Sequence, residues 1–91
     1  TGALSIVTAD VTANTDDGIF ARGEGTSLSI DSSAGAVSGG GRGIEALNNG
    51  AGATTITVDD VVGLGGEGIL AANTVAGTSI FVQSSSIFAN L

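Results

Sequence analysis

The chain contains no cysteine, proline, methionine, tryptophan, tyrosine or histidine, and its only basic residues are Arg22 and Arg42. Without cysteine it can form neither a disulfide nor a thiolate metal site. Without histidine, lysine and tyrosine it lacks several side chains that commonly serve as general acid or base, and the absence of lysine excludes a Walker phosphate loop. Because translation starts on methionine, we expect the chain to be part of a longer product.

The charge balance is strongly acidic. The net charge is −7, from nine acidic residues against the two arginines. No basic patch can therefore neutralise a row of phosphates, so the composition predicts no nucleic-acid partner. No run of about 18 apolar residues is present, so we expect no membrane insertion by this chain.

Small and aliphatic residues are what the chain has in quantity. Its 91 residues include 16 glycines and three phenylalanines, and 42% are hydrophobic, mostly alanine, valine, isoleucine and leucine. β-Branched residues favour strands, while glycine and serine favour tight turns. The composition predicts an all-β protein with short strands and a narrow aliphatic core.

One short pattern recurs at a fixed spacing: a charged residue, glycine, isoleucine, a variable residue and alanine. Its copies span residues 17–21, 42–46 and 67–71, so the two intervals between them are equal. A constant period of this length, about 25 residues, is typical of a repeat architecture in which similar units stack on one another.

Two further patterns accompany the first. Alternating apolar triplets occupy residues 4–6, 28–30, 56–58 and 80–82, so the middle interval is longer than the equal intervals on either side of it. We place the excess in the glycine- and asparagine-rich turn at residues 48–52. Shorter apolar spots occupy residues 11–13, 36–37, 61–62 and 87–88. Three short strands per repeat predict one coil of a parallel β-helix, in which each strand pairs with its copies above and below.

We therefore predict a single β-solenoid over residues 1–91, with three short strands and about 25 residues per coil and about four coils in all. The approximate coils are residues 1–25, 26–50, 51–75 and a partial 76–91.

The first pattern assigns faces, because alternate residues of a strand share a side. The predicted inward columns are Ile19, Ile44 and Ile69, with Ala21, Ala46 and Ala71 beside them, and the outward column is Phe20, Glu45 and Leu70. A change of the outward Glu45 to aspartate is expected to be nearly silent. The glycines Gly18, Gly43 and Gly68 are placed at a corner where a side chain is sterically costly or φ is positive. Before them, Asp17, Arg42 and Glu67 are expected to stack as negative, positive and negative, which opposes a slipped register.

This succession of a polar residue, Gly-Ile-x-Ala, a glycine- and asparagine-rich turn and a Leu/Ile-x-Ile/Val strand resembles the passenger repeats of bacterial autotransporters, the type V secreted proteins. The resemblance covers nearly the whole chain. It implies a right-handed parallel β-helix at the outer surface of Gram-negative bacteria, within a larger secreted chain that acts as an adhesin, an aggregation factor or a stalk. We expect a structural and interaction module with neither catalysis nor a cofactor, whose partner is a host-surface protein or glycan.

A fragment of a β-helical carbohydrate-active enzyme is an alternative, because such enzymes use clustered carboxylates. The acid pairs are Asp16-Asp17 and Asp59-Asp60. Adjacent strand residues point to opposite faces, so neither pair is expected to converge on one glycosidic bond unless a turn brings its members together. Weak calcium binding at these acids is a further alternative. The predicted outward column of Ser5, Ser29, Thr57 and Phe81 lacks the repeated Thr-x-Thr of an ice-binding face.

Another alternative is a self-assembling solenoid that stacks into filaments. Residues 1–3 lead directly into a strand and residues 86–91 break off within a repeat, so neither end resembles the polar cap that solenoids usually need. Open strand edges recruit other strands. We therefore expect end-to-end self-association of the isolated chain.

Overall fold

The computed structural model describes residues 3–24, 26–49, 51–73, 79–84 and 86–89. All regular structure in these residues is β-strand, and no helix occurs among them. The strands are β1 (Leu4–Val7), β2 (Val11–Thr12), β3 (Ile19–Gly23), β4 (Leu28–Ser32), β5 (Val37–Gly39), β6 (Ile44–Asn48), β7 (Thr54–Val58), β8 (Asp60–Gly63), β9 (Ile69–Asn73), β10 (Ile80–Gln83) and β11 (Ser86–Ala89).

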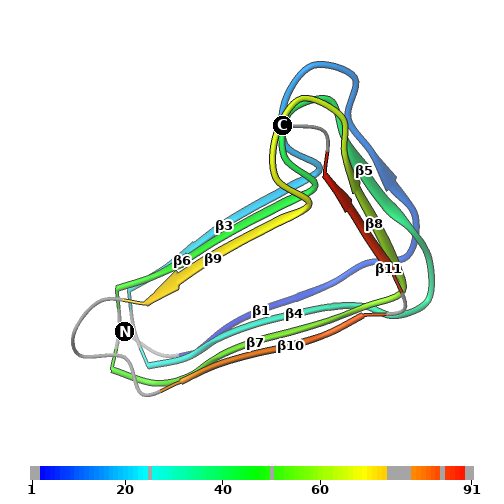
Figure 1. Ribbon diagram of the computed structural model, residues 1–91. Coiled ribbons are helices and arrows are strands. Elements are labelled where there is room, and N and C mark those ends of the chain that lie inside the picture. Colours follow the sequence, from blue (N-terminus) through cyan, green and yellow to red (C-terminus); the bar gives the residue numbers. More distant parts are fainter. Residues whose placement is uncertain (1–2, 25, 50, 74–78, 85, 90–91) are drawn as a thin grey trace.

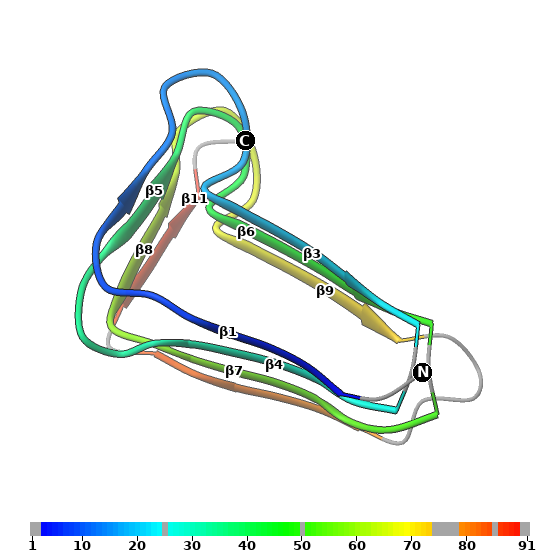
Figure 2. The same cartoon turned by 180° about the vertical axis from the view of Figure 1, so that it is seen from behind.

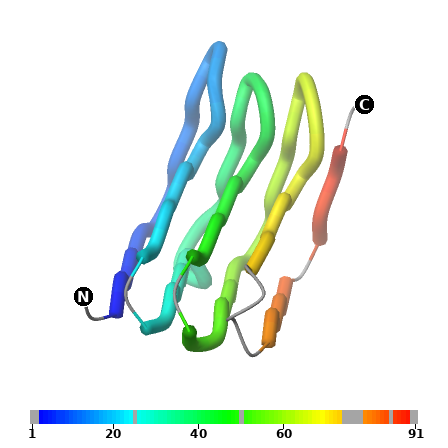
Figure 3. The backbone as a smooth tube through the Cα atoms, turned by 90° about the vertical axis from the view of Figure 1, so that its left-hand side faces the viewer, coloured from blue at the N-terminus to red at the C-terminus, as the bar shows by residue number. Residues whose placement is uncertain are grey.

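The strands form three parallel sheets, which are the three sides of a triangular coil (Figure 1 and Figure 2). The sheet orders are β1-β4-β7-β10, β2-β5-β8-β11 and β3-β6-β9. Each strand pairs with the equivalent strand of the next coil, so the coils lie side by side along one axis (Figure 3). The chain makes about 3 turns of ~25 residues, and β10 and β11 continue into a further coil. The predicted all-β solenoid with three strands per coil is confirmed.

The sheet β3-β6-β9 has the register that the constant period predicts. Ile44 pairs with Ile19 on one side and Ile69 on the other, while Ala46 pairs with Ala21 and Ala71 in the same way. In β3 and β6 these isoleucines and alanines are buried, and in β9 they are partly buried and pack against the same core. The alternate residues Phe20, Glu45 and Leu70 form the next column in register.

The sheet β1-β4-β7-β10 corrects one register expected from the sequence. Leu28 pairs with Thr54, and Thr54 with Ile80, so the two intervals are equal, whereas alignment of the apolar triplets placed Ile56 opposite Leu28. A shift of two residues keeps every side chain on its own face, so alternation does not distinguish the two registers. The outward column consequently contains Ser5, Ser29, Thr55 and Phe81, with Thr55 in place of Thr57.

A polar contact explains why Thr54 occupies a position where an aliphatic residue was expected. The Thr54 side chain is buried, and its hydroxyl donates to Oδ1 of Asn73. The Asn73 amide in turn donates to the Ser79 carbonyl at 2.7 Å. A buried hydroxyl with a hydrogen-bond partner avoids the desolvation penalty of an unpaired one. Part of the expected excess lies nearby, since five residues separate β6 from β7 and four separate β3 from β4; residue 50 of this turn is outside the described residues.

The core lies inside the triangle and consists of aliphatic columns contributed by all three sheets. The sheet β2-β5-β8-β11 adds Val11, Val37 and Val61 in register, and Ile87 continues this column but is half exposed. The fully buried larger apolar side chains are Leu28, Ile30, Val37, Ile44, Ile56 and Val61. Because all six belong to β4–β8, the middle coils carry most of the buried apolar surface.

The glycine column at the corner before β3, β6 and β9 is required by close packing between coils. A Cβ on Gly43 would lie 2.5 Å from Cγ1 of Val61 and 2.6 Å from the carbonyl oxygen of Gly68. A Cβ on Gly18 would lie 2.8 Å from Val37 Cγ1, and one on Gly68 would meet Ile87 Cγ2 more closely still. None of the three glycines has φ in the left-handed region. The sequence offered two reasons for glycine at this corner. Steric exclusion of a side chain is the one that applies, and a positive φ is not.

Candidate functional site

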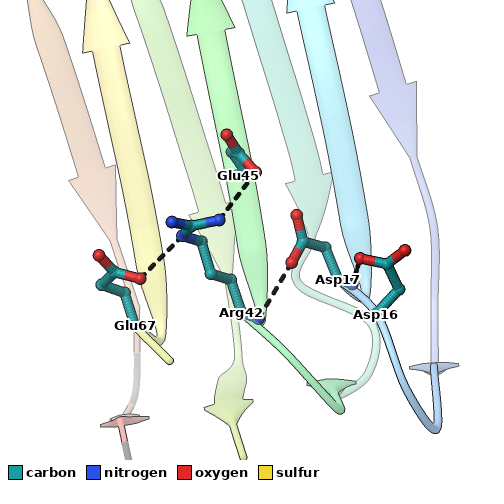
Figure 4. Close-up of polar contacts among 5 residues, drawn as sticks. All are labelled: Asp16, Asp17, Arg42, Glu45 and Glu67. Atoms are coloured by element: carbon teal, nitrogen blue, oxygen red, sulfur yellow. Dashed lines mark hydrogen bonds and ion pairs between the residues drawn. The ribbon is translucent and has the colours of Figure 1, made fainter. Parts of the chain in front are cut away.

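Charged residues from three consecutive coils meet on the outside of the glycine corner (Figure 4). We call Asp17, Arg42, Glu45 and Glu67 the charged corner. Nε of Arg42 donates to Oε1 of Glu67 at 2.7 Å, and an Nη of the same guanidinium contacts Oε1 of Glu45 at 3.2 Å. Arg42, in the turn before β6, thereby joins Glu67 of the turn before β9 to Glu45 on β6.

Asp17, Arg42 and Glu67, which were expected to stack as negative, positive and negative, are joined by two contacts of different kinds. The guanidinium pairs with Glu67, but Oδ1 of Asp17 accepts a hydrogen bond from the main-chain N–H of Arg42 at 3.0 Å. The second side-chain partner of Arg42 is Glu45, which sequence reasoning assigned only to an outward column. Arg42 lies in the turn before β6, and spacing within a strand does not predict which strand residue a turn side chain reaches.

The electrostatics of the charged corner are dominated by its excess of carboxylates. The hydrogen bond and charge of Glu67 raise the pKa of Arg42. The pKa of Glu67 is lowered, first by a hydrogen bond from its own main chain and then by Arg42. The pKa of Glu45 is raised, first by its side-chain contact with Asp17 and then by burial, although Arg42 acts in the opposite direction. One guanidinium does not compensate three carboxylates.

A hollow of about 400 Å³ lies beside the charged corner and is lined by Asp16, Asp17, Phe20 and Glu45. We call it the corner hollow. The Phe20 side chain is 58% exposed although it is large and apolar. The carboxylate of Asp16 accepts the Asp17 main-chain N–H at 3.0 Å, which stabilises the turn before β3. An aromatic wall with several carboxylate acceptors can pack against a ring and accept hydrogen bonds from hydroxyl or ammonium donors.

The acids Asp16 and Asp17 meet the condition that the sequence left open, which is convergence through a turn. They lie in the turn before β3 and line the same hollow, whereas adjacent residues of one strand would point to opposite faces. The exception stated for a turn therefore applies to this pair. The signal for it was present, because Asp16-Asp17 follows Thr-Ala-Asn-Thr, a composition typical of turns.

Grouped carboxylates alone do not provide the geometry for glycoside hydrolysis. Asp16, Asp17 and Glu45 line the corner hollow, but glycoside hydrolysis also needs two carboxyls at a defined separation, about 5–5.5 Å in retaining enzymes and about 6.5–9.5 Å in inverting enzymes. The corner hollow therefore provides the grouping of carboxylates on which the alternative of a carbohydrate-active enzyme depends.

The other acid pair has a separate environment. Oδ1 of Asp60 accepts the Ser86 hydroxyl at 2.8 Å, and the Asp59 main-chain carbonyl accepts the Ser86 N–H at 3.3 Å. Both contacts join β8 to β11. Among the described residues, no group of three or more acidic side chains has a geometry that could hold a metal ion. No helix within the described ranges is long and apolar enough to cross a membrane.

Comparisons with known proteins identify no relative: no family model matches the chain, and searches of curated proteins and of solved structures find no match either. The solenoid and the corner hollow are therefore the features from which a function can be inferred.

Proposed function

We propose that the chain is a structural and interaction module of a surface-exposed autotransporter passenger, in which the β-solenoid presents the corner hollow to a host-surface glycan. The observation that carries the proposal is the exposed Phe20 ring beside three carboxylates on a rigid, hydrogen-bonded scaffold. Aromatic side chains are enriched at interaction sites relative to the rest of a protein surface.

The chemistry of the corner hollow favours a glycan over an apolar partner. The flat face of a sugar ring can pack on the Phe20 ring, and its hydroxyls can donate to the carboxylates of Asp16 and Asp17. A purely apolar partner would leave these carboxylates desolvated and without hydrogen-bond donors, which is costly. A partner protein with a basic side chain is the other class that the hollow can accept.

The proposal predicts that Phe20→Ala weakens glycan binding. Loss of the stacking ring is expected to raise the dissociation constant about tenfold, which corresponds to about 1.4 kcal/mol. A glycan array identifies the ligand and calorimetry then gives the dissociation constants. Phe88→Ala is the matched control, because Phe88 is 57% exposed but lies on β11, outside the corner hollow. Equal effects of the two substitutions, or no glycan binding by the wild-type chain, would contradict the proposal.

Filament formation is the second candidate, because β10 and β11 expose large apolar side chains. These are Ile80, Phe81, Val82, Ile87 and Phe88.

Sedimentation at several protein concentrations separates the two candidates. A filament subunit forms particles that grow with concentration, whereas an interaction module keeps one sedimentation coefficient. The expected end-to-end self-association stays a prediction, and residues 1, 2, 90 and 91, on which part of it rests, lie outside the described residues.

A further inference from the structure

Arg42 contacts two of the four residues that line the corner hollow but does not line the hollow itself. Its main-chain N–H donates to Oδ1 of Asp17 at 3.0 Å, and an Nη of its guanidinium donates to Oε1 of Glu45 at 3.2 Å (Figure 4). Asp17 belongs to the turn before β3, whereas Glu45 is on β6, one coil further along the axis. One residue thereby holds carboxylates that reach the hollow from two coils.

The main chain at Arg42 is fixed against the turn that carries Asp16 and Asp17. The Gly41 N–H donates to the Asp16 carbonyl at 3.0 Å, and the Gly18 N–H donates to the Arg42 carbonyl at 3.1 Å. The Arg42 N–H adds its bond to Asp17. These contacts use main-chain groups of residues 41 and 42, which every residue except proline provides. Asp17 is therefore expected to stay in place when only the side chain of residue 42 changes.

The guanidinium, by contrast, is the part of Arg42 that holds Glu45. Its Nε donates to Glu67 at 2.7 Å, which anchors the side chain on the next coil while an Nη reaches Glu45. The donors of a guanidinium form a rigid planar fork, so the bond to Glu67 also sets the direction of the Nη groups. Without the guanidinium, the Glu45 side chain is expected to sample several rotamers, and a ligand would have to immobilise it on binding.

We propose that Arg42 is a positioning residue for the corner hollow, whose guanidinium holds the Glu45 carboxylate in the orientation that accepts a sugar hydroxyl. This role rests on the proposed glycan binding and deepens it, because it makes Glu45 a contact of the glycan. It also gives Glu67, in the turn before β9, a part in a site that it does not line. A carboxylate that is already held loses less conformational entropy on binding than a free one.

The test is a double-mutant cycle. The probe is the neutral oligosaccharide bound most tightly on a glycan array, so that removing a charge does not itself change the attraction, and calorimetry gives the dissociation constants. Arg42→Gln is expected to raise the dissociation constant about two- to fivefold, the size of effect typical of an exposed ion pair. In a Glu45→Gln background the same change should have no further effect. In an Asp17→Asn background its effect should persist, because asparagine still accepts the main-chain N–H.

Two further variants complete the design. Arg22→Gln is the matched control, because it removes the same charge from an exposed residue of β3 that does not line the hollow, and it should leave the dissociation constant unchanged. Arg42→Lys keeps the charge but loses the planar fork, so its dissociation constant should lie between those of the wild-type chain and Arg42→Gln. If urea unfolding shows that Arg42→Gln does not fold, the cycle is measured with Arg42→Lys.

A readout without ligand separates positioning from a loss of stability. Three-bond NMR couplings of the Glu45 side chain should report one dominant rotamer in the wild-type chain and averaged rotamers in Arg42→Gln. Unchanged couplings would overturn the positioning role, as would an Arg42→Gln effect that persists in the Glu45→Gln background. If Phe20→Ala weakens binding and Arg42→Gln does not, the positioning role is wrong and the proposed glycan binding stands. Absence of glycan binding by the wild-type chain would overturn both.

Discussion

We expect the Ile44→Asp variant not to fold. Ile44 has no solvent exposure and pairs with Ile19 and Ile69 on its two sides, so an aspartate there places a carboxylate among aliphatic side chains. An unpaired buried charge costs several kcal/mol even after its pKa shifts. This is comparable with the total stability of about 5–15 kcal/mol of an ordinary domain. Far-ultraviolet circular dichroism and urea unfolding check the result.

The control for Ile44→Asp is the same substitution at an exposed position. Phe81→Asp serves, because Phe81 lies in the outward column of β10 and is exposed, so its variant should keep the cooperative transition. Glu45 cannot serve as the silent position that the sequence suggested, since it forms an ion pair with Arg42 and lines the corner hollow. Comparable loss of structure in Ile44→Asp and Phe81→Asp would show that the assigned faces are wrong.

We expect Gly43→Ala to be the most damaging alanine substitution in the glycine column. The added methyl group would lie within 2.6 Å of both Val61 Cγ1 and the Gly68 carbonyl oxygen, and a main-chain oxygen cannot move without shifting the next coil. Overpacking of this kind typically costs about 1–3 kcal/mol. The free energy of unfolding in urea, compared with that of the wild-type chain, measures the loss.

Gly66→Ala is the matched control for this substitution. Its added Cβ would meet nothing closer than Cγ of Arg42 at 3.4 Å, which is an ordinary contact with a flexible side chain. Such a change is expected to leave stability within about 1 kcal/mol of the wild type, because it also restricts the unfolded chain. If Gly43→Ala and Gly66→Ala had the same stability, close packing would not be the reason for the glycine column.

The constant spacing determined the register of β3, β6 and β9 from sequence because glycine and isoleucine recur together there. Glycine at the corner and isoleucine beside it have different steric roles, and only one alignment satisfies both columns. In the sheet containing β7 no such pair exists. Alternation of faces fits two registers that differ by two residues, and the apolar triplets favoured the wrong one. In the observed register Leu28 lies opposite the buried Thr54, whose hydroxyl is paired with Asn73.

The corner hollow could not be predicted because it depends on the path of a turn. Asp16 and Asp17 were recognised as candidate acids, but their convergence with Phe20 and Glu45 requires the turn before β3 to lie over β6. Periodicity describes what repeats, and this turn does not repeat: residues 16 and 17 are both aspartate, whereas the equivalent residues of the next coil are Gly41 and Arg42. The period of a repeat does not predict a feature that occurs in one coil only.

The parallel pairing of each coil with its neighbours also has a kinetic consequence. Every strand pairs with the equivalent strand one coil away in sequence, so the first contact between two coils must close a loop of that size before any pairing energy is gained. Once two coils are in register, their outer strands are already formed. The next coil must close a loop of the same size, but it pairs with strands that are already in place. We therefore expect folding to begin with slow nucleation, in which two coils pair, and to continue by faster addition of one coil at a time.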